Sequence, residues 1–355
     1  MGADINAHGG DIYSYVIEKG ELPLDYSANI NPLGLSREVK KAFLTAAGKL
    51  CSYPDVTCRG LRKLTAQYEG CREEELLFGN GAADLIYRIC FALKPKKALL
   101  PAPTFSEYGQ ALQSLPCDLA YFHLKPETDF MITQEILPLI NGKEILFLCN
   151  PNNPTGRVTD PALLYQIAMR CEEVNCILVI DECFMDFVAG KEKLSFQKYL
   201  SQFKQVIILK AFTKIFAMPG LRLGYLMSSN HEVIKKIQAA GQAWSVSVPA
   251  QAAGEAALQE KEYLNRTIKL ITQERNYLTK ALIQLGFRVF FSDTNFILFQ
   301  TEDMYLYQKL YQKGILIRSC ENFKGLDSSY YRIAVKRRKD NQKLISAIKE
   351  VINHG

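Results

Sequence analysis

The sequence has no long hydrophobic run, and this absence argues against a membrane-spanning helix. None of its 355 residues belongs to an uninterrupted apolar stretch of 18, whereas a helix that crosses a bilayer needs about 20. The first residues, MGADINAHGGDIYSYV, lack the basic and apolar regions of a signal peptide. We therefore expect no membrane partner.

Histidine and paired cysteines are also scarce. The sequence has only four histidines, and its ten cysteines are scattered without a CxxC motif. Metal sites usually need closely spaced ligands of these types, so we expect no metal. Cysteines without such spacing, in a chain with no export signal, are interpreted as reduced thiols of a cytoplasmic protein.

Charges of one sign are not clustered along most of the chain. Lysine and arginine total 43 against 37 aspartate and glutamate, a net charge of +6. Basic and aromatic residues do not interleave in the manner of a nucleic-acid-binding surface, so no nucleic-acid partner is expected. A mild positive excess suits a small anionic substrate.

The pattern between about residues 75 and 230 alternates short apolar strands with helical stretches. This alternation predicts an α/β fold with a mostly parallel sheet covered by helices on both faces. The predicted strands are 97–100, 118–123, 144–149, 177–181, 206–209 and 223–227.

After about residue 250 the pattern changes to a smaller α+β region. A long amphipathic helix is predicted over 261–285, followed by strands at 287–291, 295–299 and 331–335 and a helix near 340–353. The predicted organisation is an N-terminal arm (1–30), a large domain (31–248) and a small C-terminal domain (249–355).

Two lysines lie four residues apart in KAFTKIFAMPGLRLGY, which begins at Lys210. The second, Lys214, follows the strand 206–209 and would sit at its carboxyl edge, where open α/β sheets place ligands. Lysine is seldom buried without a partner, so one of the pair is expected inside for its chemistry. Lys210 is interpreted as the ordinary lysine of the two.

Other loops at the same sheet edge offer complementary groups. Asp181 ends the strand ILVID, and Asn153 lies in the turn-rich NPNNPTG after strand 144–149. GNGAAD at 79–84 is a glycine-rich turn that opens a helix and would present backbone N–H groups to an anion. Arg222 adds a cation. An amine, a carboxylate, an amide and an anion cradle are the groups that pyridoxal phosphate requires.

This set resembles the fold-type I pyridoxal-phosphate enzymes of the class I and II aminotransferase group, over nearly the whole chain. The resemblance implies that Lys214 forms the Schiff base with the cofactor, that Asp181 pairs with the pyridine nitrogen, and that Asn153 binds the ring hydroxyl. It also implies a large domain with a mostly parallel seven-stranded sheet. The remaining cofactor residues that it implies are Gly81, Ala82, Ala83, Phe105, Thr213 and Arg222, with Tyr53 supplied by the other subunit of a homodimer.

The sequence departs from the group's pattern at three places. Ala211 stands where relatives commonly carry a hydroxyl, and Ala82 and Ala83 replace a polar pair. Phe184 stands where aminotransferases usually have a tyrosine that touches the ring oxygen. We expect each lost hydrogen bond to weaken cofactor retention by about 0.5–1.5 kcal/mol.

The N-terminal AHGGDIY and LDYSANINPLG, with GILIRSCENFKGL and YYRIAV near the C-terminus, resemble the L-threonine-O-3-phosphate decarboxylases of cobalamin biosynthesis. The reaction implied is decarboxylation to (R)-1-amino-2-propanol O-2-phosphate and CO2. The substrate contacts implied are His8, Gly9, Asn29, Asn153, Arg318 and Arg332. Two arginines suit the carboxylate and the phosphate of one small substrate, because a guanidinium group can donate two parallel hydrogen bonds to either anion.

Two related functions stay open at this point. A histidinol-phosphate or related aminotransferase would use the same cofactor site, although Phe184 and the HGG arm oppose it. Serine phosphate could replace threonine phosphate, because one methyl group gives only about 1–3 kcal/mol of discrimination.

Overall fold

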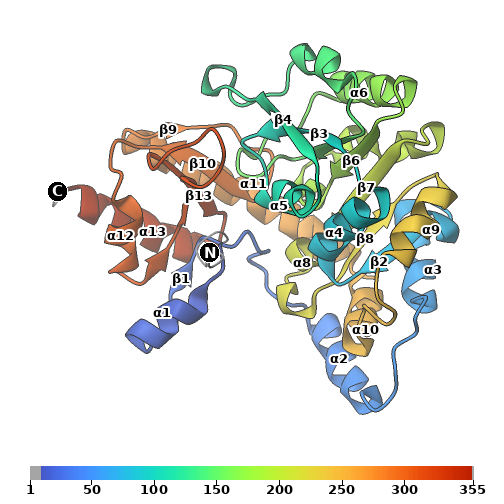
Figure 1. Ribbon diagram of the computed structural model, residues 1–355. Helices are drawn as coiled ribbons and strands as arrows, with labels where there is room; N and C mark the ends of the chain where they lie inside the picture. Colours follow the sequence, from blue (N-terminus) through green and yellow to red (C-terminus); the bar gives the residue numbers. More distant parts are fainter. Residues whose placement is uncertain (1–8, 354–355) are drawn as a thin grey trace.

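Seven strands form the large sheet of the computed structural model, which describes residues 9–353 (Figure 1). Their order is β2-β8-β7-β6-β5-β3-β4, and β8 alone runs antiparallel to its neighbours. The predicted mostly parallel sheet is therefore confirmed. The strands are β2 (Leu76–Gly79), β3 (Lys97–Ala102), β4 (Asp118–His123), β5 (Ile145–Cys149), β6 (Ile177–Asp181), β7 (Val206–Ala211) and β8 (Gly224–Met227).

Both faces of this sheet are buried under helices. Alternate residues of β7 enter different apolar clusters: Ile207 and Leu209 face one side, and Val206 and Ile208 face the other. Burial on both faces explains why the strands read as continuous apolar runs. The first side carries α4 (Gly81–Leu93), α5 (Ser106–Gln113) and α9 (His231–Ala239); the second carries α3 (Arg59–Glu69), α6 (Pro161–Glu173) and α10 (Val248–Ala257).

The C-terminal part builds a second, smaller sheet in the order β12-β13-β10-β9. The predicted strand 287–291 shortens to two residues, and the pattern did not reveal β12. The strands are β9 (Arg288–Val289), β10 (Phe296–Gln300), β12 (Arg318–Ser319) and β13 (Tyr330–Ala334). The helices of this part are α11 (Lys261–Gln284), α12 (Leu306–Tyr311) and α13 (Arg338–Asn353).

The N-terminal arm lies against this C-terminal part (Figure 1). Its strand β1 (Leu24–Asp25) pairs in parallel with β11 (Ile315–Leu316). Tyr311 donates a hydrogen bond of 2.6 Å to Glu18 in the arm helix. The helices not yet named are α1 (Ile12–Lys19), α2 (Arg37–Ala46), α7 (Lys191–Leu194) and α8 (Phe212–Ile215). The domain boundaries at residues 30 and 248 stay a prediction.

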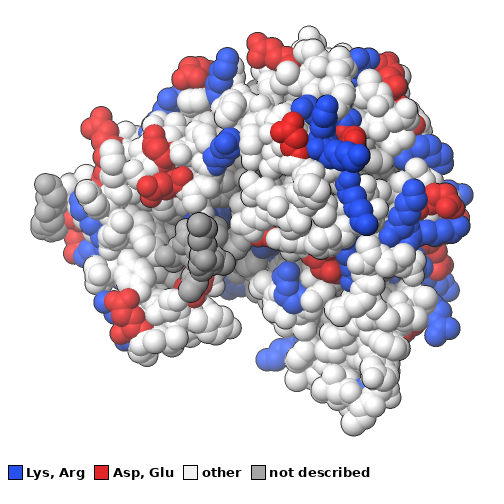
Figure 2. Space-filling view, viewed as in Figure 1, with Lys and Arg blue, Asp and Glu red and all other residues white. Residues whose placement is uncertain are grey.

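Surface charge is mixed on the face shown in Figure 2, where lysine and arginine alternate with aspartate and glutamate. Within residues 9–353, no helix is both long and apolar enough to cross a bilayer.

Candidate active site

A cavity of about 360 Å³ opens where the carboxyl ends of the parallel strands meet the small sheet. This volume lies within the range of about 300–1,000 Å³ that is typical of small-ligand sites. Twelve of the predicted site residues line it: Gly9, Asn29, Ala82, Ala83, Phe105, Asn153, Asp181, Thr213, Lys214, Arg222, Arg318 and Arg332. Segments far apart in the sequence thus converge on one space.

Three predicted residues do not appear in that lining. Gly81 lies just behind it, against Arg222. Tyr53 is 79% exposed and stacks on Trp244, with ring centroids 4.6 Å apart. His8 lies outside the described residues.

Lys214 lies in the short helix α8, directly after β7, and its side chain faces the cavity. Burial lowers the pKa of this amine from 10.5 to about 8; Cys183 opposes that shift, whereas Arg332 and Arg222 add to it. At pH 7 an amine with a pKa of about 8 is unprotonated in roughly a tenth of the molecules, a far larger share than for an ordinary lysine, so it is able both to act as a nucleophile and to carry a proton.

Lys210, interpreted from the sequence as the ordinary lysine of the pair, is enclosed as well. Only 3% of it is exposed, and its Nζ lies 3.1 Å from both carboxylate oxygens of Glu69 and 3.8 Å from Glu182. Burial alone would lower its pKa, but Glu69, Asp186 and Glu182 raise it well above the ordinary value. Lys210 therefore stays protonated. The pKa values of the two lysines shift in opposite directions because carboxylates outweigh the effect of burial at Lys210, whereas Arg332 and Arg222 add to the effect of burial at Lys214.

Asp181 ends β6 and carries a carboxylate that is held on two sides. Its Oδ2 accepts a 2.6 Å hydrogen bond from the Tyr108 hydroxyl, and its Oδ1 accepts one of 2.9 Å from the backbone N–H of Cys183. Tyr108 also packs edge-on against Phe105, with ring centroids 5.6 Å apart. Tyr108 therefore orients the carboxylate and supports the ring that lines the cavity. The sequence reasoning missed it, although its place three residues after Phe105, on the same face of α5, was a usable signal.

An anion cradle lies at the beginning of α4. Gly81 has a φ of +83°, and a Cβ at this position would lie 2.6 Å from Nη2 of Arg222. Only glycine allows this approach without displacing the guanidinium. Ala82 and Ala83 offer backbone N–H groups at the helix N-terminus but no hydroxyl, so this end of the cavity presents N–H donors and one arginine.

The small sheet supplies two arginines at directly opposed positions. Arg318 of β12 pairs in register with Arg332 of β13, and both are at least 92% buried. Burial, with a smaller contribution from Arg318, lowers the pKa of Arg332 to about 10. Like charges placed opposite each other on a sheet are destabilising. An anion bound between them would remove that cost.

The hydrogen-bond partners of Arg332 are neutral. Its Nη1 donates to Oδ1 of Asn153, its Nη2 donates to the backbone oxygen of Ser27 at 2.7 Å, and its Nε has no partner among the described residues. Asn29 also lines the cavity, and its Oδ1 is buried without a hydrogen-bond partner among residues 9–353. Buried polar atoms of this kind normally find a partner, so both suit the binding of a polar ligand in this cavity.

The N-terminal arm reaches the cavity through Gly9. A Cβ at this position would lie 2.2 Å from the backbone oxygen of Ser27. A side chain at residue 9 would therefore push this part of the arm away from Ser27, in the segment that follows β1.

These features fit pyridoxal phosphate. The cradle at Gly81 and Arg222 suits its phosphate, Asp181 suits its ring nitrogen, and the lowered pKa of Lys214 makes its amine available to the aldehyde. Phe184 lines the cavity 94% buried, with its ring edge-on to Phe296 at 5.0 Å, so no hydroxyl occupies that position.

Comparison with known proteins extends this picture. The model of the family "Aminotransferase class I and II" matches residues 23–348. Threonine-phosphate decarboxylase of Salmonella typhimurium is 36% identical, with 98% of this chain and 97% of that protein covered. The adenosylcobalamin biosynthesis bifunctional protein CobDQ of Leptospira interrogans is 32% identical, with 97% of this chain but 41% of that protein covered. The crystal structure of the histidinol-phosphate aminotransferase from Clostridium acetobutylicum has a TM-score of 0.88 at 32% identity, with 94% of this chain and all of that chain covered.

Proposed function

This chain belongs to the class I and II aminotransferase family, and we propose that it uses pyridoxal phosphate to decarboxylate L-threonine O-3-phosphate. The products are (R)-1-amino-2-propanol O-2-phosphate and CO2, and the reaction serves cobalamin biosynthesis. Support comes from the likeness to a threonine-phosphate decarboxylase and to a bifunctional protein of adenosylcobalamin biosynthesis.

The observation that carries the proposal is the opposed arginine pair in the cavity that holds Lys214. A substrate with a carboxylate and a phosphate brings two anionic groups to Arg318 and Arg332. Guanidinium groups bind both kinds of anion in a bidentate manner. Anchoring at two points fixes rotation about the Cα–N bond, and this rotation decides which bond to Cα breaks.

In the proposed reaction, the bond between Cα and the carboxylate carbon breaks and CO2 leaves. When bound, pyridoxal phosphate supplies an electron sink for the pair that remains on Cα. Lys214 then donates the proton that takes the place of CO2, so one proton is consumed for each CO2 released. Its lowered pKa of about 8 suits this transfer near neutral pH.

Asp181 and the arginines have separate tasks in this reaction. Asp181, oriented by Tyr108, holds the proton on the ring nitrogen. Arg332, fixed by Asn153 and Ser27, holds one end of the substrate. The way in which these residues anchor the substrate would therefore decide which bond to Cα breaks.

Amine transfer from histidinol phosphate is the second candidate, because the Clostridium acetobutylicum aminotransferase shares this fold at 32% identity. The phenyl ring of Phe184 speaks against it, since it leaves no hydroxyl beside the ring oxygen. Serine phosphate is a further candidate substrate for the decarboxylation.

We also propose that the active unit is a homodimer. Tyr53 and Trp244 form an exposed aromatic pair outside the cavity of their own chain. Such a pair suits a second subunit, whose cofactor phosphate Tyr53 would reach. The ten free cysteines agree with a reducing compartment, and we propose the cytoplasm.

The deciding experiment offers threonine phosphate, serine phosphate and histidinol phosphate separately to one preparation. CO2 release and amine transfer to a 2-oxo acid are measured in parallel. We expect CO2 from threonine phosphate and little transfer from any substrate. Brisk transfer from histidinol phosphate without CO2 from either phosphoamino acid would contradict the proposal but leave the cofactor site standing.

An arginine substitution tests the anchoring itself. Arg332→Lys should lower kcat/KM roughly 10- to 100-fold, because an ammonium replaces a two-point contact by one. Unchanged activity would show that Arg332 does not bind substrate.

A further inference from the structure

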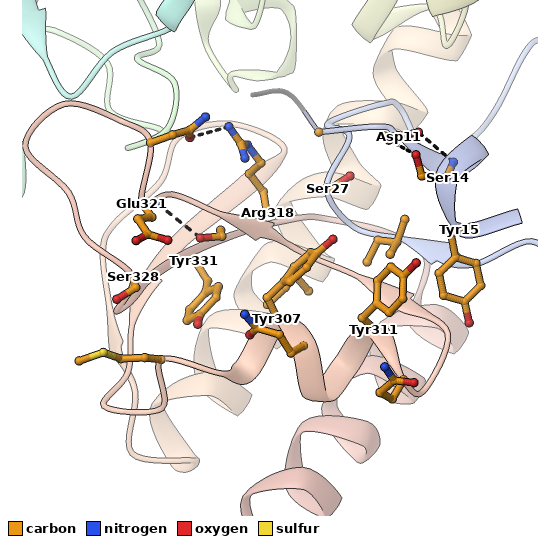
Figure 3. Close-up of a pocket in the computed structure, with 18 residues that line it drawn as sticks. Asp11, Ser14, Tyr15, Ser27, Tyr307, Tyr311, Arg318, Glu321, Ser328 and Tyr331 are labelled. Carbon is orange, nitrogen blue, oxygen red and sulfur yellow. Dashed lines mark hydrogen bonds between the residues drawn. The ribbon is translucent and has the colours of Figure 1, made fainter. Parts of the chain in front are cut away.

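A second, outer pocket of about 630 Å³ adjoins the catalytic cavity (Figure 3). Gly9, Ser27 and Arg318 line both spaces, so the two meet at these residues. The outer pocket lies between the arm helix α1 and α12 of the C-terminal part. Anything anchored at Arg318 can therefore extend from one space into the other.

The hydroxyl of Tyr307 differs from those of Tyr311 and Tyr331, which line the same pocket. Tyr311 donates to Glu18 at 2.6 Å, and Tyr331 donates to the backbone oxygen of Asp303 at 3.3 Å. In the part of the chain that the structure describes, the Tyr307 hydroxyl makes no hydrogen bond. Figure 3 shows it directed into the pocket, towards the segments that carry Ser27 and Arg318.

Tyr307 is close enough to Arg318 to feel its charge. Burial raises the pKa of Tyr307 and Asp11 adds to this effect, whereas Arg318 lowers it. The guanidinium of Arg318 is itself held by Oδ1 of Asn322 at 2.7 Å and lies over the Phe323 ring, 5.4 Å from its centroid. A fixed cation and an uncommitted O–H donor thus face the same space.

The geometry of the substrate decides which anionic group goes there. The carboxylate is attached directly to Cα, which has to lie beside Lys214. The phosphate is attached through Cβ and an ester oxygen, so it alone extends away from the reacting carbon. Its three terminal oxygens accept several hydrogen bonds at once. Asp11 and Glu321, which also line the outer pocket, repel a negative charge, so the phosphate is expected at the junction beside Arg318 and not deeper in that pocket.

We propose that the substrate phosphate lies where the two cavities meet, and that the Tyr307 hydroxyl binds it as a second donor beside Arg318. This inference rests on the proposed function only in assuming a phosphorylated substrate. Tyr307 is then a phosphate-binding residue that distinguishes phosphorylated from unphosphorylated amino acids.

The test compares Tyr307→Phe with Tyr311→Phe. Both substitutions remove one hydroxyl from the same pocket, but the Tyr311 hydroxyl is already committed to Glu18. Inorganic phosphate is the probe, and its binding to each holoenzyme is measured by calorimetry, with the cofactor's own phosphate site already filled. The KM and kcat for threonine phosphate are measured alongside.

We expect Tyr307→Phe to weaken phosphate binding and raise KM by roughly 5- to 20-fold, with kcat nearly unchanged, since a hydrogen bond to an anion is lost. Tyr311→Phe should match the wild type in both. Equal losses in the two variants, or no loss in Tyr307→Phe, would overturn the inference. If threonine phosphate is not decarboxylated at all, the proposed function fails, and weaker binding of inorganic phosphate by Tyr307→Phe alone would still uphold the inference.

Discussion

Replacing Lys210 by methionine should destabilise the protein without removing the cofactor lysine. Methionine approximates the length of lysine but leaves Glu69 and Glu182 without their counter-charge. Breaking a buried ion pair by removing one partner typically costs about 3–5 kcal/mol. Here Glu69 also accepts a 2.5 Å hydrogen bond from Tyr225, and Glu182 accepts bonds of 2.6 and 2.7 Å from Ser195 and Phe196. Because the carboxylates stay hydrogen-bonded, we expect a loss of about 3 kcal/mol, at the lower end of that range.

Urea unfolding of the wild type and the variant, with fitted slopes compared, gives this loss as a change in unfolding free energy. The double variant Lys210→Met/Glu69→Gln is the matched control, since it removes both opposite charges. It should lose less than the sum of the two single variants by at least about 1 kcal/mol, because residues in contact are coupled. Additive losses, or a cost below about 1 kcal/mol for Lys210→Met, would refute the view that this pair is a buried and mutually dependent one.

The remaining predictions concern the cavity. Borohydride reduction should attach the pyridoxyl group to Lys214 and not elsewhere; in cofactor-free protein this amine should react with amine reagents half-maximally near pH 8 rather than 10.5. Because this amine binds more protons in the unfolded chain between these two values, Lys214 contributes a rise in stability with pH in that window, measured as the difference between the pH profiles of the wild type and Lys214→Met. Tyr108→Phe should raise the pKa at which the bound cofactor's absorbance titrates, since Asp181 loses a donor and carries more negative charge; an unshifted titration would contradict this. Mixing Lys214→Ala chains with Tyr53→Phe chains should restore one sound site per mixed dimer, measured as recovered activity, and no recovery would mean that Tyr53 serves its own subunit.

Local sequence pattern was sufficient for the sheet edge and for the groups that gather there. Strand ends are marked by a change from apolar to polar residues, so this pattern alone places Asp181, Asn153 and Lys214 at one edge. The alternation of short apolar strands with helical stretches likewise predicted the mostly parallel sheet.

Pairings between distant segments were beyond that reasoning. Nothing local shows that Arg318 lies opposite Arg332, because β12 has two residues and its register depends on β13. The burial of Lys210 could not be foreseen either, since its partner Glu69 lies 141 positions away. Charges that neutralise each other across such distances look, one at a time, like solvated surface residues.

The pairing of β1 with β11 has a consequence for the order of assembly during synthesis. Leu24 leaves the ribosome early, but its partner Ile315 is among the last residues to be made. The arm that brings Gly9 to the active site cannot take its place until almost the whole chain exists. A truncated chain that ends before β11 would therefore keep every group at the edge of the large sheet. It would still lack the strand with which the N-terminal arm pairs. Completeness of the polypeptide is, in this fold, a condition for closing the site.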